Sequence, residues 1–403
     1  MALADVSGAS TQHPLTGASR REESQPQRRK MTRLSQRFYL PQLVPSLLLI
    51  AFGVVIIWSA SLNIADANFP RHVVGVVLGL ITAWFVRSYD YRAFSNMSTA
   101  LFVLDCFLMI SPRIPGLGVE AMGITGWVRI PFIKFRFQPS EVAKLVTIFL
   151  MASLGAQYNG RVETLRDYVK LCGILTVPFL LILLQPDLGT GLIVLVTGAS
   201  IIICSGARSS WVLVTIALIV AGAALVVVTS MTPGLPHILK EYQLARLIVF
   251  VDPSVDPGGI GYNLQQSKIA VGSGGLFGKG IGNASQSGTG FLPEAHTDFV
   301  FALLSEEFGF VGSAGVLLLF GWMIFSTISL AQRIDLPFAK LILAGIATMW
   351  SFQVLQEVGM CIGIMPITGI PLPFISFGST SMVAHCMAIG VVQSVWHYRT
   401  KAA

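Results

Sequence analysis

The sequence predicts an all-α polytopic membrane protein, and three observations lead to this fold class. Of 403 residues, 53% are hydrophobic and 12% are charged, about half of the ~25% charged share that is typical of soluble domains. Apolar runs near the ~20 residues that cross a bilayer recur along the chain. These runs lack the alternation of outer-membrane β-strands, and backbone groups in lipid must be satisfied within the segment, which favours a helical bundle.

Ten apolar runs are predicted to be membrane-spanning helices. They cover residues 41–61, 71–86, 97–111, 140–156, 168–185, 188–206, 210–231, 299–330, 338–361 and 379–397. The runs that begin at residues 71 and 97 are short, so they are expected to tilt or to thin the bilayer. The first run exceeds the apolar length of a signal peptide and nine more follow it, so it is predicted to stay as an anchor.

Basic residues predict the orientation of the bundle. The segment before the first span contains Arg20, Arg21, Arg28, Arg29, Lys30, Arg33 and Arg37. The positive-inside rule places this segment in the cytoplasm, and an even number of spans returns the C-terminus to the same side. Residues 1–38 are therefore predicted to be a cytoplasmic disordered basic tail, and residues 39–403 the transmembrane domain. The net charge of +7 lies mainly in the tail and inner loops, where anionic headgroups attract it, and does not indicate nucleic acid.

The predicted outer loop of residues 112–139 is unusual because it is basic. It contains Arg113, Arg129, Lys134 and Arg136, on the side of the membrane that the positive-inside rule keeps poor in cations. A phosphate-bearing ligand would offset the cost of these charges, and ordinary surface charge is the alternative.

The predicted outer loop of residues 232–298 is the largest segment outside the membrane. Residues Leu239 to Val251 mix apolar and charged side chains at helical spacing, which predicts a helix on the membrane surface. Pro253 and Pro257 then end this helix, and residues 267–290 are dense in glycine. The glycine-dense part fails the Walker A pattern because Lys279 is followed by glycine, so it is either a loose pyrophosphate cradle with Lys279 in a supporting role or a flexible loop.

Asp298 is the principal candidate for chemistry. It lies where the polar loop of residues 232–298 gives way to the eighth span, and a carboxylate at the edge of the bilayer needs water, a cation or a substrate hydroxyl as its partner. His296 is expected to orient or protonate a group, or else to be structural. Glu294 is a second possible metal or acceptor ligand, and Glu306 and Glu307, about two helical turns further on, are expected to be structural.

Five long segments, in this order along the chain, carry a resemblance to the SEDS family of bacterial shape, elongation, division and sporulation proteins. They read FRFQPSEVAKL, LLQPDLGTGLIVL, YNLQQSKIAVGSGGLFGKG, FLPEAHTDFVFALLSEEFGFVG and MCIGIMPITGIPLPFISFG. The resemblance runs from about residue 40 to the end, and the QSKIA and MPITGIPLPF stretches are more similar to the RodA branch than to the FtsW branch. The turn after the last segment departs from the family, which usually reads SYGGSS where this chain has SFGSTS.

The resemblance implies a ten-helix, GT-C-like polymerase that joins lipid II units into peptidoglycan glycan strands during cell elongation. It also implies a class B penicillin-binding transpeptidase as partner, other elongation machinery, and a place in the bacterial cytoplasmic membrane. The essential loop aspartate of the family falls on Asp298. Lipid II flippase activity and membership of the division or sporulation branch are the alternatives. An ion-coupled transporter is disfavoured because its acids would lie near the bilayer midplane.

Two roles for Asp298 are consistent with glycosyl transfer. An ionised carboxylate can accept the proton of the attacking sugar hydroxyl, as in inverting glycosidases. It can equally hold a divalent cation, Mg²⁺ or Mn²⁺, against the pyrophosphate of the donor, since hard cations prefer carboxylate and phosphate oxygens. No organic cofactor is expected.

The remaining candidates support the substrate or the fold. Glu141 and Lys144 are three residues apart on one helix and are expected to form an ion pair, which resembles a functionally sensitive pair of the family. Asp187 is expected to cap the sixth helix near Leu188, with catalytic support as the alternative. The forked donors of Arg71, Arg136 and Arg246 match phosphate. Contact with lipid headgroups is the alternative for these arginines and is favoured for Arg71.

Overall fold

The computed structural model describes residues 36–121, 124–129, 136–232, 241–252, 255–256, 258–288 and 290–399. The predicted basic tail before residue 36 lies outside these ranges, as do Lys134, Leu239, Pro253 and Pro257.

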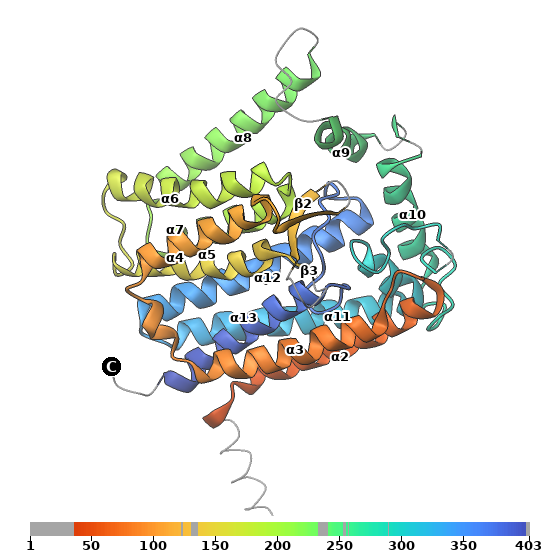
Figure 1. Ribbon diagram of the computed structural model, residues 1–403, viewed down its shortest axis with the longest axis horizontal. Helices are drawn as coiled ribbons and strands as arrows, with labels where there is room; N and C mark the ends of the chain where they lie inside the picture. Colours follow the sequence, from red (N-terminus) through yellow and green to blue (C-terminus); the bar gives the residue numbers. More distant parts are fainter. Residues whose placement is uncertain are drawn as a thin grey trace, which may run out of the picture.

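Ten long helices run roughly side by side within the described ranges and account for most of the molecule (Figure 1). Each corresponds to one of the ten predicted spans. Their bounds are α2 Leu40–Asn63, α3 Phe69–Ser88, α4 Ser98–Ile110, α5 Pro139–Ala156, α6 Leu165–Leu184, α7 Leu188–Cys204, α8 Ser209–Met231, α11 Val300–Gln332, α12 Pro337–Ile362 and α13 Ser379–Tyr398. The prediction of an all-α polytopic membrane protein is confirmed.

Seven of these helices, among the residues that the structure describes, are long and apolar enough to cross a membrane by themselves; they are α2, α3, α5, α6, α8, α11 and α12. The other three helices, α4, α7 and α13, are held in position by packing against neighbouring helices. Helix α4 has only 13 residues and packs on α5. Helix α7 has 17 residues and packs on α12, and α13 packs on α3.

Glycine allows α3 and α13 to pack closely. A Cβ atom at Gly75 would lie 2.9 Å from Cα of Ser379, and one at Gly79 would lie 2.8 Å from Sγ of Cys386. Small residues at such contacts are typical of helix pairs in lipid, where close packing replaces the hydrophobic effect. The start of α2 meets the end of α13, because N–H of Tyr39 donates to Oε1 of Gln393 over 2.8 Å. The first and last helices of the bundle therefore begin and finish on the same side of it, as an even number of spans requires.

Helix α8 differs from the rest because it leans away from the bundle (Figure 1). It is 23 residues long, and Ser230 is its one buried residue. A helix that is apolar on all sides but buries nothing against protein has lipid as its solvent.

One end of the bundle carries the additional structure, and we call it the sheet end. Three antiparallel strands, β1 Gly118–Ala121, β2 Ile124–Arg129 and β3 Arg136–Phe137, pair in the order β1-β2-β3. Treating residues 112–139 as a loop was therefore incomplete. Helix α9, Glu241–Val251, is present as predicted. Helix α10, Ile260–Ser273, was missed, because its C-terminal half lies in the glycine-dense stretch.

Candidate active site

Asp298 lies in a tight turn that leads into α11. The carbonyl of Glu294 accepts hydrogen bonds from N–H of Thr297, Asp298 and Phe299 at 3.2, 3.0 and 3.2 Å. Glu294 itself has a φ of 53°, an uncommon conformation for a residue other than glycine. Its Oε2 also accepts from Oγ1 of Thr297 over 2.6 Å. The turn therefore fixes the backbone of Asp298 through several short-range bonds.

The connection between α12 and α13 holds this turn from the other side. N–H of Phe377 donates to the carbonyl of His296 over 2.9 Å, and Oγ of Ser376 donates to the carbonyl of Thr297 over 2.7 Å. Gly369 lies directly against the carboxylate, since a Cβ atom there would be 3.1 Å from Oδ2 of Asp298. Glycine also suits the φ of 69° at that position.

The charges around Asp298 disfavour its ionisation. Burial raises the pKa of Asp298 to about 6, the negative charges of Glu294 and Asp187 add to this effect, and Arg246 on α9 partly offsets it. A carboxyl group with a pKa near 6 is largely ionised at neutral pH and is a stronger base than an ordinary aspartate. Three parts of the chain, the turn of residues 294–298, the start of α7 and helix α9, thus bring Asp298, Glu294, Asp187 and Arg246 into one electrostatic cluster.

Glu141 and Lys144 form the predicted ion pair. Nζ of Lys144 lies 2.9 Å from Oε1 of Glu141, and the side chains are 2% and 3% exposed. Oε2 of Glu141 is buried and has no hydrogen-bond partner within the described part of the chain. The pair faces Asp187, whose charge interacts with both. A buried pair with one free acceptor can take part in binding a hydroxyl or amide donor, which an entirely satisfied pair could not.

Asp187 caps α7, which confirms one of its two predicted roles. Its Oδ1 accepts from N–H of Thr190 over 3.0 Å. Burial raises the pKa of Asp187, and the bond from Thr190 opposes this shift.

Arg71 and Arg136 flank the N-terminus of α13. The carbonyl of Arg71 accepts from Oγ of Ser379 over 3.3 Å, and that of Arg136 accepts from Oγ1 of Thr380 over 3.5 Å. Both arginine side chains are exposed. No side chain caps this helix start. Its amide groups and the backbone of two arginines lie at one place, and a helix N-terminus beside basic residues favours anions.

His296 is buried, and its ring packs 5.5 Å from that of Phe377. Burial lowers the pKa of His296, against the opposing effect of Glu294 and Asp66. Burial therefore favours the neutral form of the imidazole.

Lys279 lies apart from Asp298, in a network centred on Glu306. Oε1 of Glu306 accepts from Nζ of Lys279 over 2.7 Å and from N–H of Ser285 and Gln286 over 2.8 and 2.9 Å. Its Oε2 accepts from N–H and Oγ of Ser287 over 3.0 and 2.9 Å. These bonds favour structural roles for Lys279 and Glu306. Oε1 of Glu307 accepts from Oγ of Ser59 over 2.5 Å, which also favours a structural role for Glu307.

The glycine-dense segment packs on a kink of α11. Gly309, within that helix, has a φ of 65° and a ψ of −164°. Cβ atoms at Gly274 and Gly278 would lie 1.9 and 2.1 Å from the carbonyl oxygens of Ser305 and Glu307. The glycines therefore permit close approach of backbone to backbone, which gives them a reason for being there that does not involve a phosphate.

Two residues near Asp298 were not among the predicted site residues. Glu357 on α12 is fully buried, and its Oε1 accepts from N–H of Phe301 over 3.1 Å, which ties the start of α11 to α12. Gly369 is the other. A glycine in a proline-rich turn, as in the Thr-Gly-Ile-Pro stretch around Gly369, is a local signal for a positive φ. No local sequence signal predicts the contact between Glu357 and Phe301.

The described residues contain no group of three or more histidine, cysteine, aspartate or glutamate side chains that could hold a metal ion. Mg²⁺ commonly uses one or two carboxylates together with substrate phosphates. Asp298 fits that sparse donor set only with a phosphate-bearing substrate in place.

The sequence and the fold both match known proteins. A family model described as "Cell cycle protein", covering FtsW, RodA and SpoVE, matches residues 41–401. The chain belongs to this SEDS family. Stage V sporulation protein E of Bacillus subtilis is 34% identical over 361 residues, covering 88% of this chain and 95% of the relative. The probable peptidoglycan glycosyltransferase FtsW of Coxiella burnetii is 35% identical, covering 86% and 93%.

Peptidoglycan glycosyltransferase MrdB of Escherichia coli is 32% identical, covering 88% of this chain and 92% of the relative. Sporulation and division relatives therefore match this SEDS chain about as well as MrdB does, and the identities do not separate the branches.

Solved SEDS structures share the fold. The rod shape determining protein RodA of Thermus thermophilus superposes with a TM-score of 0.66 at 26% identity, covering 91% of this chain and 98% of RodA. A chain from a structure titled "Structural coordination of polymerization and crosslinking by a peptidoglycan synthase complex" superposes with a TM-score of 0.75 at 27% identity, covering 91% and 99%.

Proposed function

We propose that this SEDS protein is a peptidoglycan glycosyltransferase that polymerises lipid II into glycan strands at the outer face of the bacterial cytoplasmic membrane. Relatives that are 32–35% identical over most of the chain are named for that activity. The observation that carries the proposal is the position of Asp298 directly before α11, in a turn held from two sides and with a pKa raised to about 6.

Asp298 acts as the general base in the proposed reaction. The acceptor sugar hydroxyl attacks the anomeric carbon of the donor, and its proton passes to the carboxylate of Asp298 as the new C–O bond forms. The bond from that carbon to the lipid pyrophosphate breaks, its electron pair leaves with the phosphate oxygen, and the anomeric centre is inverted. The charge that develops on the leaving group is stabilised at the start of α13, between Arg71 and Arg136.

Holding a divalent cation is the alternative role for Asp298. When bound, the cation would neutralise charge on the pyrophosphate of the donor, and Asp298 would be among its ligands instead of accepting the proton. Glu141 and Lys144 then serve to position the donor, because Oε2 of Glu141 is buried and free to accept a hydrogen bond.

A class B penicillin-binding transpeptidase is the proposed partner, and cell elongation the proposed process. The structural match to a chain of a peptidoglycan synthase complex supports the partner. The QSKIA and MPITGIPLPF stretches support the RodA branch. We place both termini in the cytoplasm because seven arginine and lysine residues precede the first span.

Purified protein, mixed with its partner transpeptidase, fluorescent lipid II and Mg²⁺ or Mn²⁺, tests the proposal. Wild-type protein is expected to produce glycan ladders and Asp298→Asn none, while Asp335→Asn, an exposed aspartate between α11 and α12, polymerises normally. Ladders from Asp298→Asn at the wild-type rate would refute the assignment of the base. Lipid translocation without polymer from the wild type would instead identify a flippase.

A further inference from the structure

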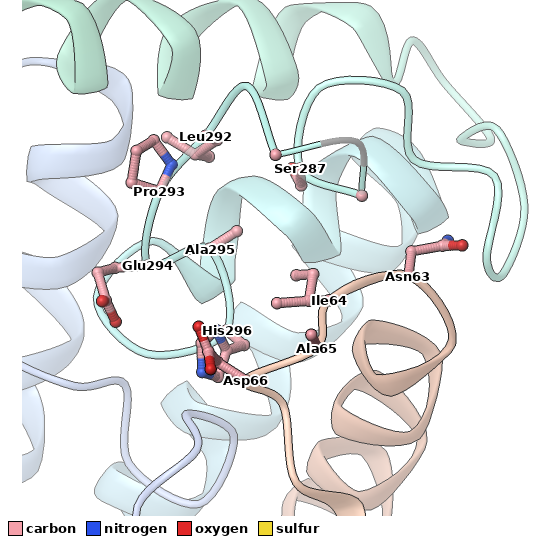
Figure 2. A pocket seen from close by; sticks show the side chains of 12 residues that line it. Asn63, Ile64, Ala65, Asp66, Ser287, Leu292, Pro293, Glu294, Ala295 and His296 are labelled. Atoms are coloured by element: carbon pink, nitrogen blue, oxygen red, sulfur yellow. The ribbon is translucent and has the colours of Figure 1, made fainter.

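A separate cavity lies beside the turn that carries Asp298 (Figure 2). Its volume is about 430 Å³, and it is lined by the connection between α2 and α3, residues 63–66, and by parts of the segment 287–296. Asp298 is not part of its lining. The volume is within the roughly 300–1,000 Å³ of small-molecule sites.

The cavity combines hydrogen-bonding groups with an apolar surface. Asp66, Glu294 and His296 supply two carboxylates and an imidazole, and Ile64 and Leu292 supply apolar surface. Figure 2 shows the imidazole of His296 next to the carboxylate of Asp66. Hydroxyl groups donate readily to carboxylates and to neutral imidazole, and the C–H faces of a sugar can pack on aliphatic side chains.

His296 is the most buried of the three ionisable residues in the lining. The residue is 6% exposed, and its Nδ1 is buried with no hydrogen-bond partner among the described residues. A ligand in the cavity would therefore meet the rest of the imidazole ring. The lining contains neither lysine nor arginine, which disfavours a phosphate group as the part of the ligand that binds here.

The walls of the cavity are preorganised. Ser287 is fixed by its two bonds to Oε2 of Glu306, and Nδ2 of Asn63 donates to the carbonyl of Gly282 over 2.8 Å. A ligand therefore meets groups that are already in place and loses less affinity to the ordering of loops.

One turn joins the cavity to the reacting carboxylate. Glu294 lines the cavity, and its carbonyl accepts the N–H of Asp298 four residues later. We propose that this cavity is the subsite of the acceptor saccharide, holding its hydroxyl-rich rings through Asp66, Glu294 and His296 while the attacking hydroxyl reaches around the turn to Asp298. This inference rests on the proposed function. It places the acceptor sugar in a cavity without lysine or arginine, and the pyrophosphate of the donor at the start of α13, next to Arg71 and Arg136.

A lipid-free disaccharide-peptide of peptidoglycan is the probe that tests the subsite. Its binding is measured by calorimetry on the full chain in lipid nanodiscs, with wild type, Asp66→Leu, Asp298→Asn and the matched control Asp335→Leu. We expect wild type, Asp298→Asn and Asp335→Leu to bind alike, and Asp66→Leu to bind at least tenfold more weakly. In polymerisation assays Asp66→Leu should raise KM for lipid II by a similar factor and leave kcat within about twofold.

Two results would overturn the subsite: no binding of the disaccharide-peptide to the wild type at millimolar concentration, or wild-type affinity and KM for Asp66→Leu. The binding measurement is independent of catalysis. If Asp66→Leu loses binding but Asp298→Asn still polymerises, the subsite stands and the proposed base fails.

Discussion

Replacing Gly369 with alanine tests whether the position of the Asp298 carboxylate sets the rate. The new methyl group would lie 3.1 Å from Oδ2 of Asp298, closer than ordinary van der Waals contact, so the carboxylate must retreat by a few tenths of an ångström. A misplacement of about 1 Å can cost roughly 10²-fold in rate. A shift of a few tenths should therefore lower kcat by roughly threefold to tenfold.

Backbone strain contributes separately to this variant and requires a control. An alanine held at a φ of 69° costs roughly 1–2 kcal/mol of stability. Gly116 has a φ of 87°, and no atom lies within 4 Å of the place that a methyl group would take there, so Gly116→Ala carries the same strain without the contact.

Glycan ladder rates and thermal unfolding of the two variants distinguish the effects. Both are expected to lose similar stability, and only Gly369→Ala should lose kcat. Equal kcat values for Gly369→Ala and Gly116→Ala would refute the argument that Gly369 sets the position of the carboxylate.

Four further predictions follow from charges and hydrogen bonds. Because the general base must be ionised, kcat/KM should rise with pH to half its maximum near pH 6; a rate that is flat from pH 5 to 8 would contradict this. A raised carboxyl pKa means that folding penalises the charged form, so stability falls as pH rises from about 4 to 6. Asp298→Asn should therefore melt at a higher temperature than wild type at pH 7.5 and at the same temperature below pH 4. Lys144→Met leaves Glu141 as an unpaired buried charge and should lower the unfolding free energy by roughly 3–5 kcal/mol. The double variant with Glu141→Gln should recover most of this stability. A double variant as unstable as Lys144→Met would show that the unpaired charge does not cause the loss. Glu306→Gln should lower the unfolding free energy by roughly 2–4 kcal/mol and speed proteolysis between residues 279 and 287. An unchanged cleavage rate would mean that the carboxylate of Glu306 does not fix this segment.

The sequence predicted the helices well because their signals are local. Apolar runs mark all ten, including the short ones, and Pro139 and Pro337 lie at the starts of α5 and α12, where a missing N–H costs nothing. The surface helix α9 followed from its mixed periodicity. The strands between Gly118 and Phe137 were missed because glycine interrupts their alternation, and α10 was missed because glycine follows it closely.

The candidate site was predictable in part. Asp298 and the pair of Glu141 and Lys144 stand out as charges at or within apolar runs, and a helical spacing of three predicts their ion pair. The contacts of Gly369 with Asp298 and of Glu357 with Phe301 join residues that are 71 and 56 positions apart. Such contacts depend on how α11, α12 and the following turn meet in space, and a single sequence carries no periodic signal for them.

Because α8 is isolated from the bundle, its tilt depends on the surrounding lipid. At about 1.5 Å per residue, its 23 residues measure roughly 35 Å, close to the ~30 Å hydrocarbon core. Because protein contacts bury so little of α8, the thickness of the surrounding lipid sets its tilt. The tilt of α8 is therefore expected to change with the acyl length of the lipid more than the tilt of the helices that are packed inside the bundle.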